Sequence, residues 1–300
     1  MRVAILDDVH DAYGATAGVR RLRERAEVTI FRKAIPLELR GFDALIANRE
    51  RTRFTRELLE QLPHLRIIAQ TGNHAYHIDL DAAAERGVIV ARATGGFSYG
   101  AAELTIALAM ALMRQIPAAD AAMRRGEWRT PTTRVLHGKT LGIVGLGHVG
   151  GHVATLGHAF GMNVLSAGRG SDARELDELM RLSDVVSIHA TLSPQTRGLI
   201  DARRIGLMKR GAYLINTARA AIVDTAALVA ALQTQRIAGA GLDVFDEEPL
   251  PAGHPLTRLA NVVLTPHLGW PTDEAYERFA EAASEVLLAY LDGKEVARFQ

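Results

Sequence analysis

Short apolar runs alternate with amphipathic segments along the whole chain. In the first hundred residues these runs are rich in Val, Ile and Leu. Two helical patterns, at 55–61 and 79–86, are each opened by a capping residue. Strands that alternate with helices predict a parallel sheet with helices on both faces. The predicted strands of this part are 3–6, 28–31, 44–47, 65–69 and 88–91.

A second alternation of strands and helices begins at Leu141. Its strand count is typical of the doubly wound sheet of dinucleotide-binding domains. A final amphipathic helix, at 272–292, is long enough to return to the first domain and cover it. The pattern therefore predicts an α/β protein with two doubly wound parallel-sheet domains. The predicted strands of this part are 141–144, 163–167, 184–189, 212–216, 238–243 and 262–265.

Two more helices are predicted ahead of the second sheet. The first runs from about 100 to 115 and is expected to be capped by Ser98 or a neighbour, and the second runs from Pro117 to Arg125. Because the first is apolar nearly all round, it must be buried on several sides, and we expect it to pack against a second copy of the chain. The polar segment 126–133 is predicted to be an exposed arm. A homodimer is therefore expected, and a closed two-fold pair is also the commonest assembly.

The composition is ordinary for a soluble globular protein and changes the picture little. Hydrophobic residues make up 48% and charged residues 23%, and the formal net charge of +1 does not indicate binding to nucleic acid or to a membrane. The chain has no cysteine, so disulfides and thiolate metal sites are excluded, and no metal site is predicted. Its N-terminus enters a strand at once, and its most apolar run, 104–113, is too short to span a bilayer. A cytoplasmic protein is expected.

The segment that follows Thr140 carries a glycine pattern with a physical reason at each position. Gly145, Gly147 and Gly150 follow a short apolar strand at the spacing G-x-G-x-x-G. The first allows a tight turn, the second lets a pyrophosphate approach the backbone, and the third lets the next helix pack closely. That helix is predicted to begin near His148, with its unpaired N–H groups facing the anion. Because the motif lies between a strand and an apolar helix, it predicts dinucleotide binding.

Three charged residues follow predicted strands in the second half of the chain. Arg219, Glu248 and His267 would all lie at the carboxyl edge of a parallel sheet, where ligands bind. An arginine can hold a carboxylate through two hydrogen bonds, and a histidine can give a proton to a carbonyl oxygen. A carboxylate beside the imidazole orients it and favours its protonated form. Each residue alone is better explained as a surface or core side chain, so the prediction depends on their combination.

Several long motifs make the chain similar to a known family. It resembles the D-isomer-specific 2-hydroxyacid dehydrogenases, which include reductases of glyoxylate and hydroxypyruvate and dehydrogenases of phosphoglycerate. The resemblance covers almost the full length and implies a Rossmann-type cofactor domain, residues 99–271. That domain would be inserted in a flavodoxin-like substrate-binding domain, residues 1–98 and 272–300. The matching motifs are 145–150, 184–191, 208–219, 241–249 and 264–269.

The resemblance implies a role for individual residues. Arg219 would bind and polarise a 2-oxo acid, Glu248 would support the histidine, and His267 would be the acid/base. Asp243 would contact the amide of a nicotinamide. The other cofactor contacts predicted from the motifs are Gly145, Gly147, His148, Val149, Gly150, His189, Ala190, Thr191, Thr196, Thr217 and Ala218.

The chain departs from the family in two places where a substrate side chain should lie. A glycine-rich loop of the first domain binds the substrate carboxylate in the family, and the matching residues here are Thr71, Gly72 and Asn73. Only Gly72 remains of the usual run of small residues, and Asn73, His74 and Tyr76 add bulk and hydrogen-bond donors. After His267, the usual pair of glycines is replaced by Gly269 and Trp270, and Trp270 is either a substrate contact or a plain hydrophobic wall. These changes affect the identity of the substrate and not the type of reaction.

The end of the strand 163–167 predicts which dinucleotide is used. An acidic residue about 20 positions past the glycines binds the ribose hydroxyls of NAD. Here that place holds Gly168, Arg169 and Ser171, and no carboxylate. Arg169 can face a 2′-phosphate with a forked pair of hydrogen bonds. NADP is therefore predicted to be preferred, with NAD as the alternative.

Two functions of different classes are consistent with the sequence. The first is an NAD(P)H-dependent reductase of small 2-oxo acids, which is a 2-hydroxyacid dehydrogenase in reverse. The second is a dinucleotide-sensing interaction protein without catalysis, like the corepressors that share this fold. The intact Arg219, Glu248 and His267 favour the enzyme.

Overall fold

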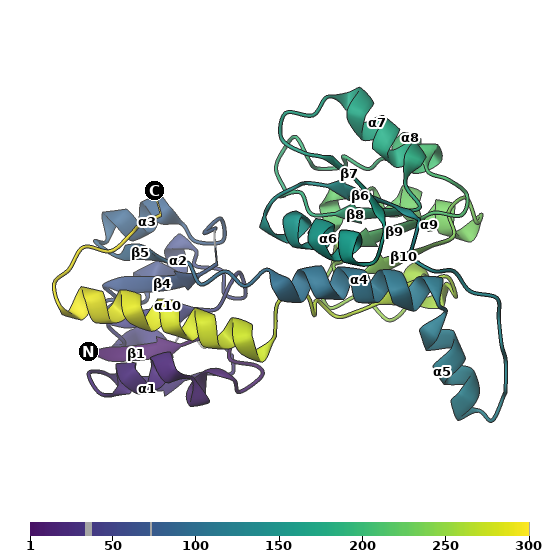
Figure 1. Ribbon diagram of the computed structural model, residues 1–300. Helices are drawn as coiled ribbons and strands as arrows, with labels where there is room; N and C mark the ends of the chain where they lie inside the picture. Colours follow the sequence, from purple (N-terminus) through teal and green to yellow (C-terminus); the bar gives the residue numbers. More distant parts are fainter. Residues whose placement is uncertain (34–37, 73, 300) are drawn as a thin grey trace. The chain divides into compact units, whose positions relative to one another are not determined.

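The computed structural model describes residues 1–33, 38–72 and 74–299. The chain forms two compact units. Unit 1 consists of Met1–Phe97 and Pro271–Gln300, and unit 2 consists of Ser98–Trp270. In Figure 1 the last helix, drawn in yellow, lies beside the purple and blue strands of unit 1, although it is distant from them in sequence. That unit 1 binds the substrate and unit 2 binds the cofactor remains a prediction.

Unit 1 is built on a five-stranded parallel sheet with the order β2-β1-β3-β4-β5. The order reverses between β1 and β3, and this switch point is where doubly wound sheets bind ligands. The helices pack on both faces, as the alternation predicts. The strands are β1 (Arg2–Ile5), β2 (Glu27–Ile30), β3 (Ala44–Ala47), β4 (Ile67–Thr71) and β5 (Ile89–Ala93), and the helices are α1 (Ala17–Arg23), α2 (Arg56–Glu60), α3 (Leu80–Glu85) and α10 (Asp273–Leu291).

Caps and close packing explain where the helices of unit 1 lie. The side chains of Thr55, Asp79 and Thr272 each accept a hydrogen bond from a backbone N–H in the first turn of α2, α3 and α10. Helix α1, which was not predicted, packs against α10. A Cβ on Gly18 would lie 2.6 Å from the carbonyl oxygen of Ala280, so the glycine permits this close crossing.

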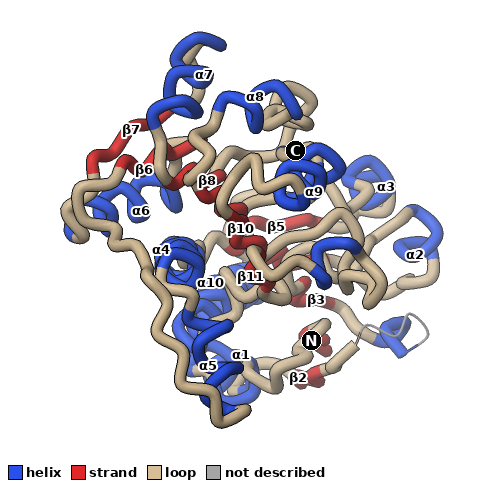
Figure 2. Tube along the Cα trace, turned by 90° about the vertical axis from the view of Figure 1, so that its right-hand side faces the viewer, coloured by secondary structure: helices blue, strands red, loops and turns tan. Residues whose placement is uncertain are grey.

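Unit 2 contains a six-stranded parallel sheet with the order β11-β10-β9-β8-β6-β7. Its switch point lies between β6 and β8. Both views place α4 and α6 on one side of the sheet and α7 and α8 on the other (Figures 1 and 2). The strands are β6 (Thr140–Val144), β7 (Asn163–Ala167), β8 (Val185–Ile188), β9 (Tyr213–Asn216), β10 (Gly239–Leu242) and β11 (Val262–Leu264), and the helices are α4 (Tyr99–Met113), α5 (Ile116–Arg124), α6 (His148–Ala159), α7 (Ala173–Leu182), α8 (Ala202–Leu207) and α9 (Thr225–Gln233).

The two faces of this sheet carry separate cores. Leu141, Ile143 and Ile215 pack with α4 and α6, while Val186 and Leu214 pack with the helices of the other face. Because side chains alternate across a strand and both faces are covered, the strands read as continuous apolar runs. The two-sheet α/β fold predicted from the sequence is therefore confirmed.

Helix α4 begins differently from the prediction. Ser98 precedes its first turn, but the Ser98 side chain makes no capping hydrogen bond, because its backbone is already helical with φ −98° and ψ −6°. Among the described residues, no single helix has the length and apolar character needed to cross a membrane. Helices α4 and α5 reach that threshold only together, with a bend of 62° at the break between them.

Candidate active site

The turn after β6 requires glycine at its first position. Gly145 has φ +99°, and a Cβ there would lie 2.5 Å from the backbone nitrogen of Ala190, which follows β8. The turn therefore sits against the neighbouring strand at the switch point of the sheet. This is the crevice in which open α/β sheets bind ligands.

The other two glycines of the motif serve different purposes. Gly147 is the N-cap of α6, and a Cβ there would meet no protein atom within 4 Å. On Gly150, a Cβ would come well under 3.0 Å from the carbonyl oxygen of Gly145. Helix α6 begins at His148, as predicted, so His148 and Val149 contribute N–H groups that have no partner within the helix. These residues suit a dinucleotide, with open space at Gly147 and a helix N-terminus for its pyrophosphate.

The loop after β7 has Gly168, Arg169 and Ser171 where a ribose-binding carboxylate is expected, and its first carboxylate is Asp172. The Oγ of Ser171 accepts a hydrogen bond from the Gly168 nitrogen at 3.2 Å, and the Ser171 nitrogen donates to the Gly168 carbonyl at 3.0 Å. The next residue, Asp172, forms a capping box with Glu175, in which its Oδ1 accepts from the nitrogens of Arg174 and Glu175 in the first turn of α7. Arg169 is exposed, and no ion pair involving it occurs among the described residues.

The loop after β8 begins with a histidine that is bonded to a serine of the strand. His189 shares a hydrogen bond of 2.6 Å with the Oγ of Ser187, and burial lowers the pKa of its imidazole to about 4. Thr196 folds back on this loop, where its Oγ1 donates to the Thr191 carbonyl at 2.7 Å and accepts from the Ser193 nitrogen at 2.8 Å. The side chains of His189 and Thr196 therefore hold this loop in place.

The buried Asn216 holds the turn that carries Arg219 through two hydrogen bonds to its backbone. The Oδ1 of Asn216 accepts from the Ala218 nitrogen at 3.0 Å, and its Nδ2 donates to the Arg219 carbonyl at 3.0 Å. Thr217 bonds to Thr105 of α4 through their hydroxyls at 2.9 Å. Asn216 and Thr105 were not singled out from the sequence, although the asparagine stands directly at the end of a predicted strand.

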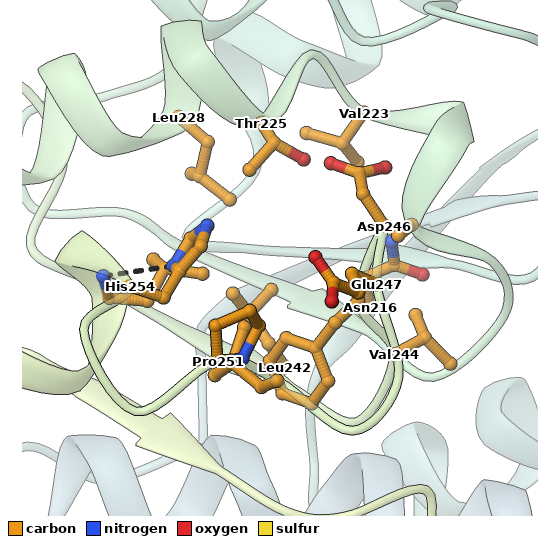
Figure 3. A pocket seen from close by; sticks show the side chains of 14 residues that line it. Asn216, Val223, Thr225, Leu228, Leu242, Val244, Asp246, Glu247, Pro251 and His254 are labelled. Carbon is orange, nitrogen blue, oxygen red and sulfur yellow. Dashed lines mark hydrogen bonds between the residues drawn. The ribbon is translucent and has the colours of Figure 1, made fainter.

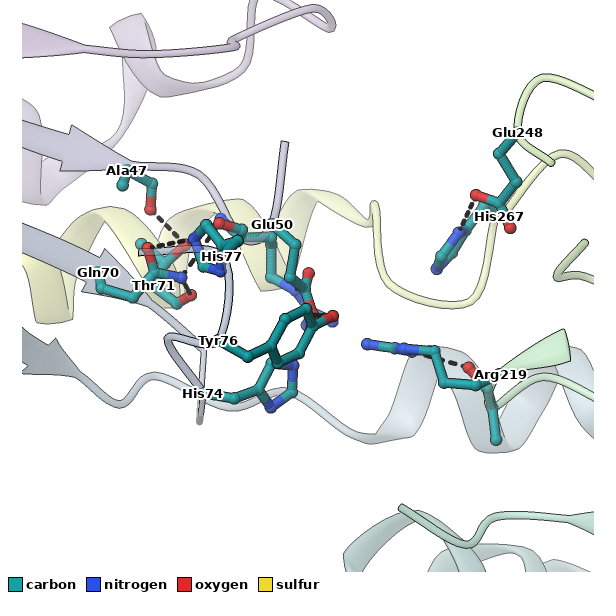
Figure 4. A network of polar contacts seen from close by, with 12 residues as sticks. Ala47, Glu50, Gln70, Thr71, His74, Tyr76, His77, Arg219, Glu248 and His267 are labelled. Atoms are coloured by element: carbon teal, nitrogen blue, oxygen red, sulfur yellow. Dashed lines mark hydrogen bonds and ion pairs between the residues drawn. The ribbon is translucent and has the colours of Figure 1, made fainter. Parts of the chain in front are cut away.

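Glu248 and His267 lie together on the loops after β10 and β11. The Nδ1 of His267 lies 2.8 Å from the Oε2 of Glu248, while the Oε1 of Glu248 accepts from the Phe245 nitrogen at 3.0 Å (Figure 4). Both side chains are about one third exposed. Since β9, β10 and β11 are neighbours in the sheet, the loops of Arg219, Glu248 and His267 share one edge. The arrangement leaves the Nε2 of the imidazole to act as an acid or base.

Asp243 is placed beneath the histidine loop. Its buried carboxylate accepts hydrogen bonds from the Thr265 hydroxyl and from the nitrogens of Leu268 and Gly269, at 2.5, 2.7 and 2.9 Å. Burial raises the pKa of Asp243, and these hydrogen bonds oppose that rise. Trp270 follows directly, and its side chain is half-buried.

A cavity of about 210 Å³ lies behind the loop that carries Glu248. Figure 3 shows apolar side chains such as Leu228 and Leu242 around it, together with the carboxylates of Asp246 and Glu247. None of the residues predicted for the site lines this cavity. Among the described residues, no group of His, Asp and Glu could hold a metal ion.

The predicted substrate loop of unit 1 begins at the end of β4. Thr71 is fully buried, and its Oγ1 donates to the Ala47 carbonyl and accepts from the Arg49 nitrogen, both at 3.0 Å. Its side chain therefore supports the loop rather than a ligand. Gly72 has φ +98°, a conformation that favours glycine. Asn73 lies outside the described residues.

Comparison with known proteins places the chain in a family. Residues 106–269 match the family model of the D-isomer specific 2-hydroxyacid dehydrogenase, NAD binding domain. A glyoxylate reductase of Aeropyrum pernix is 44% identical over 79% of this chain and 77% of its own length. A D-3-phosphoglycerate dehydrogenase of Methanocaldococcus jannaschii is 34% identical over 98% of this chain, which spans 58% of that protein.

Solved structures give the same result over the whole chain. The phosphoglycerate oxidoreductase of Vibrio cholerae has a TM-score of 0.87 and 33% identity, with 98% of this chain and 99% of that chain covered. An acyclic imino acid reductase in complex with NADPH and D-Arg has a TM-score of 0.83 and 26% identity, with both chains covered completely. The chain belongs to the D-isomer specific 2-hydroxyacid dehydrogenase family. It is a nicotinamide-dependent oxidoreductase that acts on CH–OH donors.

Proposed function

We propose that this protein reduces a small 2-oxo acid to the 2-hydroxy acid, and catalyses the reverse reaction. The observation that carries the proposal is the hydrogen-bonded pair of Glu248 and His267 beside the loop of Arg219 at one sheet edge. A bound nicotinamide dinucleotide would supply the hydride. The protein must then bind the acid, polarise its carbonyl and deliver a proton.

Each of the three residues has one task in this reaction. The guanidinium of Arg219 binds the substrate carboxylate and polarises the carbonyl. The Nε2 of His267 gives its proton to the carbonyl oxygen as the hydride reaches carbon, and takes the proton back in the reverse direction. Glu248 accepts from Nδ1, which fixes the ring and stabilises the imidazolium. Thr71, Gly72, Asn73 and Trp270 are proposed to shape the substrate site, with Thr71 acting through its backbone.

The test is turnover by variants that remove the chemistry and keep the fold. His267→Gln should lower kcat/KM by roughly 100-fold or more, because proton transfer alone contributes that much. Arg219→Gln should also lose most activity, because it removes the cation that binds the substrate carboxylate. Exposed residues of the same types provide matched controls, and Arg210→Gln and His158→Gln should retain activity. Near-native turnover by both active-site variants would refute the proposed chemistry. NADH or NADPH binding without turnover of any 2-oxo acid would instead favour the non-catalytic interaction protein.

NADPH is proposed as the preferred donor. Its support is the loop of Gly168, Arg169 and Ser171, in which the nearest carboxylate, Asp172, is used to cap α7. A similar solved structure, 26% identical to this chain, is a complex with NADPH, and this supports the same choice here. A charge-assisted hydrogen bond contributes about 1.5–3 kcal/mol before losses, so each bond from Arg169 to a 2′-phosphate favours NADPH about tenfold or more.

The ratio of kcat/KM with NADPH to kcat/KM with NADH tests this assignment. The double variant Gly168→Asp/Arg169→Ala replaces the cation by a carboxylate and should reverse the ratio. Arg174→Ala, an exposed arginine on α7, is the matched control and should leave it unchanged. A wild-type ratio that favours NADH would show that this loop does not select the cofactor.

A homodimer formed by α4, α5 and the segment after them is also proposed. Several large apolar side chains are exposed there, with Trp128 at 83%, Met123 at 53% and Ile116 at 52% exposure. We propose that these side chains together form an apolar interaction surface. Light scattering at micromolar protein should give twice the chain mass, and Trp128→Ser with Met123→Ser should shift the equilibrium toward the monomer. A monomer mass for the wild type would exclude the dimer.

A further inference from the structure

The cavity behind the loop of Glu248 is lined by residues of unit 2 alone. It has a volume of about 210 Å³, and its lining residues come from the first half of α9, the end of β10 and the segment 244–256 that follows β10. For comparison, an apolar cavity of about 150 Å³ in a protein admits benzene. The cavity therefore has room for a small organic molecule that contains such a ring.

One wall of the cavity is apolar and belongs to the core. Leu228, Leu242 and Leu256 line it, and all three are buried members of the core on this face of the sheet. Asn216 is buried in the same wall, but its amide already bonds to the backbone of the turn at Arg219. Because close packing fixes these side chains, the wall keeps its shape and offers a ligand mainly apolar contact.

Two carboxylates border the cavity where it reaches the surface. Asp246 and Glu247 are exposed, and neither has an ion pair or a hydrogen bond with another described residue. Figure 3 shows them on the side of the cavity opposite His254. The Nδ1 of His254 accepts from the Leu256 nitrogen at 3.2 Å, so this imidazole is partly engaged by its own turn.

The charge of the lining favours a cation. None of the described residues that line the cavity is a lysine or an arginine, and the arginines beside them in sequence, Arg219 and Arg258, are not part of the lining. Asp246 and Glu247 therefore set the charge at the entrance. A ligand that fits both the wall and the entrance has an apolar body and a positive charge.

We propose that this cavity is a second ligand site of the protein, which binds a small organic amine with an apolar body about the size of a benzene ring. The ring packs against Leu228 and Leu242, and the ammonium group lies at Asp246 and Glu247. The same two carboxylates repel an anion such as a 2-oxo acid. The site therefore differs in chemistry from the substrate site of the proposed reaction.

The cavity adjoins the supports of two candidate catalytic residues. Asn216 lines it and donates to the Arg219 carbonyl, while Phe245 lines it and donates through its backbone nitrogen to the Oε1 of Glu248. Neither Arg219 nor Glu248 lines the cavity itself. A bound amine thus contacts the residues that hold both loops without occupying the place of a substrate.

The experiment compares three ligands that share a ring and differ in charge: benzylamine, benzyl alcohol and benzoate. Titration calorimetry on the protein should give a Kd of about 1 mM or lower for benzylamine, a value within reach of efficient ligands of about eight non-hydrogen atoms. Benzoate should bind at least about tenfold more weakly, because its charge is repelled where that of the amine is attracted. Benzyl alcohol should lie between them.

Two variants separate the entrance from the wall. Asp246→Asn with Glu247→Gln keeps the shapes of the side chains, and should weaken benzylamine about tenfold, as expected for two exposed ion pairs, while benzyl alcohol binds as before. Glu178→Gln, the same kind of change at an exposed position on α7, is the matched control and should alter neither ligand. Leu228→Phe fills the apolar wall and should abolish the binding of both, and the charge variant decides alone if this protein does not fold.

Several results would overturn the inference. They are the absence of benzylamine binding to the wild type, benzoate binding as tight as that of the amine, and equal losses of amine and alcohol in the charge variant. Displacement of benzylamine by saturating NADPH would place it in the nucleotide crevice instead, and would also overturn the inference. The expected binding in a protein that reduces no 2-oxo acid would refute the proposed function and leave this second site standing.

Discussion

Alanine at Gly150 and alanine at Gly147 should produce opposite defects. At Gly150 a Cβ would come well under 3.0 Å from the backbone oxygen of Gly145, whereas ordinary contact begins near 3.4 Å. Neither partner can turn away, because both are backbone or directly attached to it. At Gly147 the Cβ meets no protein atom within 4 Å, and the backbone is extended with φ −90°, which alanine adopts without strain. The first change should therefore damage the fold, and the second only the binding of a ligand.

The size of the first effect follows from overpacking in a helix. Forcing an extra methyl into a closed contact costs up to about 3 kcal/mol, and alanine regains about 1 kcal/mol of helix propensity over glycine. The net loss is about 2 kcal/mol for the unit that contains the turn. For a domain of this size the midpoint should fall by about 4–8 °C.

Two measurements test these two effects, one on the protein without cofactor and one during titration with cofactor. Thermal unfolding of the apo protein should show the lowered midpoint for Gly150→Ala and a native midpoint for Gly147→Ala. Titration with NADPH, followed by nicotinamide fluorescence, should show at least about tenfold weaker binding for Gly147→Ala, because the methyl occupies the place of the pyrophosphate. A native midpoint for Gly150→Ala, or native affinity for Gly147→Ala, would contradict the assignment of the motif.

Other residues give further predictions. Glu248→Gln should lower kcat less than His267→Gln does, because the imidazole loses its anionic partner but keeps an acceptor of similar shape. Equal losses of kcat would mean that Glu248 does more in catalysis than support the ring of His267. Gly18→Ala should lower the urea midpoint of unfolding by crowding Ala280, and a native midpoint would refute that close packing. Because burial lowers the pKa of His189 from 6.5 to about 4, the unfolded chain takes up a proton before the folded chain does, and the fold loses stability as the pH falls from ~6.5 toward 4. Between pH 7 and 4.5 the wild type should therefore lose about 2–3 kcal/mol more unfolding free energy than His189→Gln, and equal losses in urea titrations would exclude this cause.

The strands could be predicted from the sequence because both sheets are parallel and covered on both faces. Each strand then appears as a short apolar run, and β3 and β7 have the bounds that the pattern predicts. Helix α1 was missed, since only a few of its residues are buried and no side chain caps it. Helix α7 was also not predicted, although Asp172 and Glu175 form a capping-box pattern that the sequence displays.

For the candidate catalytic residues of the second half, the sequence predicts only that each follows the end of a strand. Arg219, Glu248 and His267 were expected at one edge because parallel strands end there together. What fixes their orientation was not visible, because it depends on the path of the loops. Asn216 gives an example, since its two hydrogen bonds to the backbone around Arg219 exist only once the turn has formed.

The loop that carries His267 shows how buried polar groups fix the orientation of a catalytic side chain. His267 has φ +57°, which is unfavourable for a residue with a side chain and must be offset by the surrounding contacts. Asp243 provides them, because its carboxylate accepts from the two backbone nitrogens that directly follow His267 and from the hydroxyl of Thr265 before it. A buried carboxylate with three donors holds the loop from both sides, and Glu248 then sets the direction of the ring. The strain at His267 and the buried charge of Asp243 are therefore parts of one arrangement, in which an unfavourable backbone is used to aim an imidazole at the sheet edge.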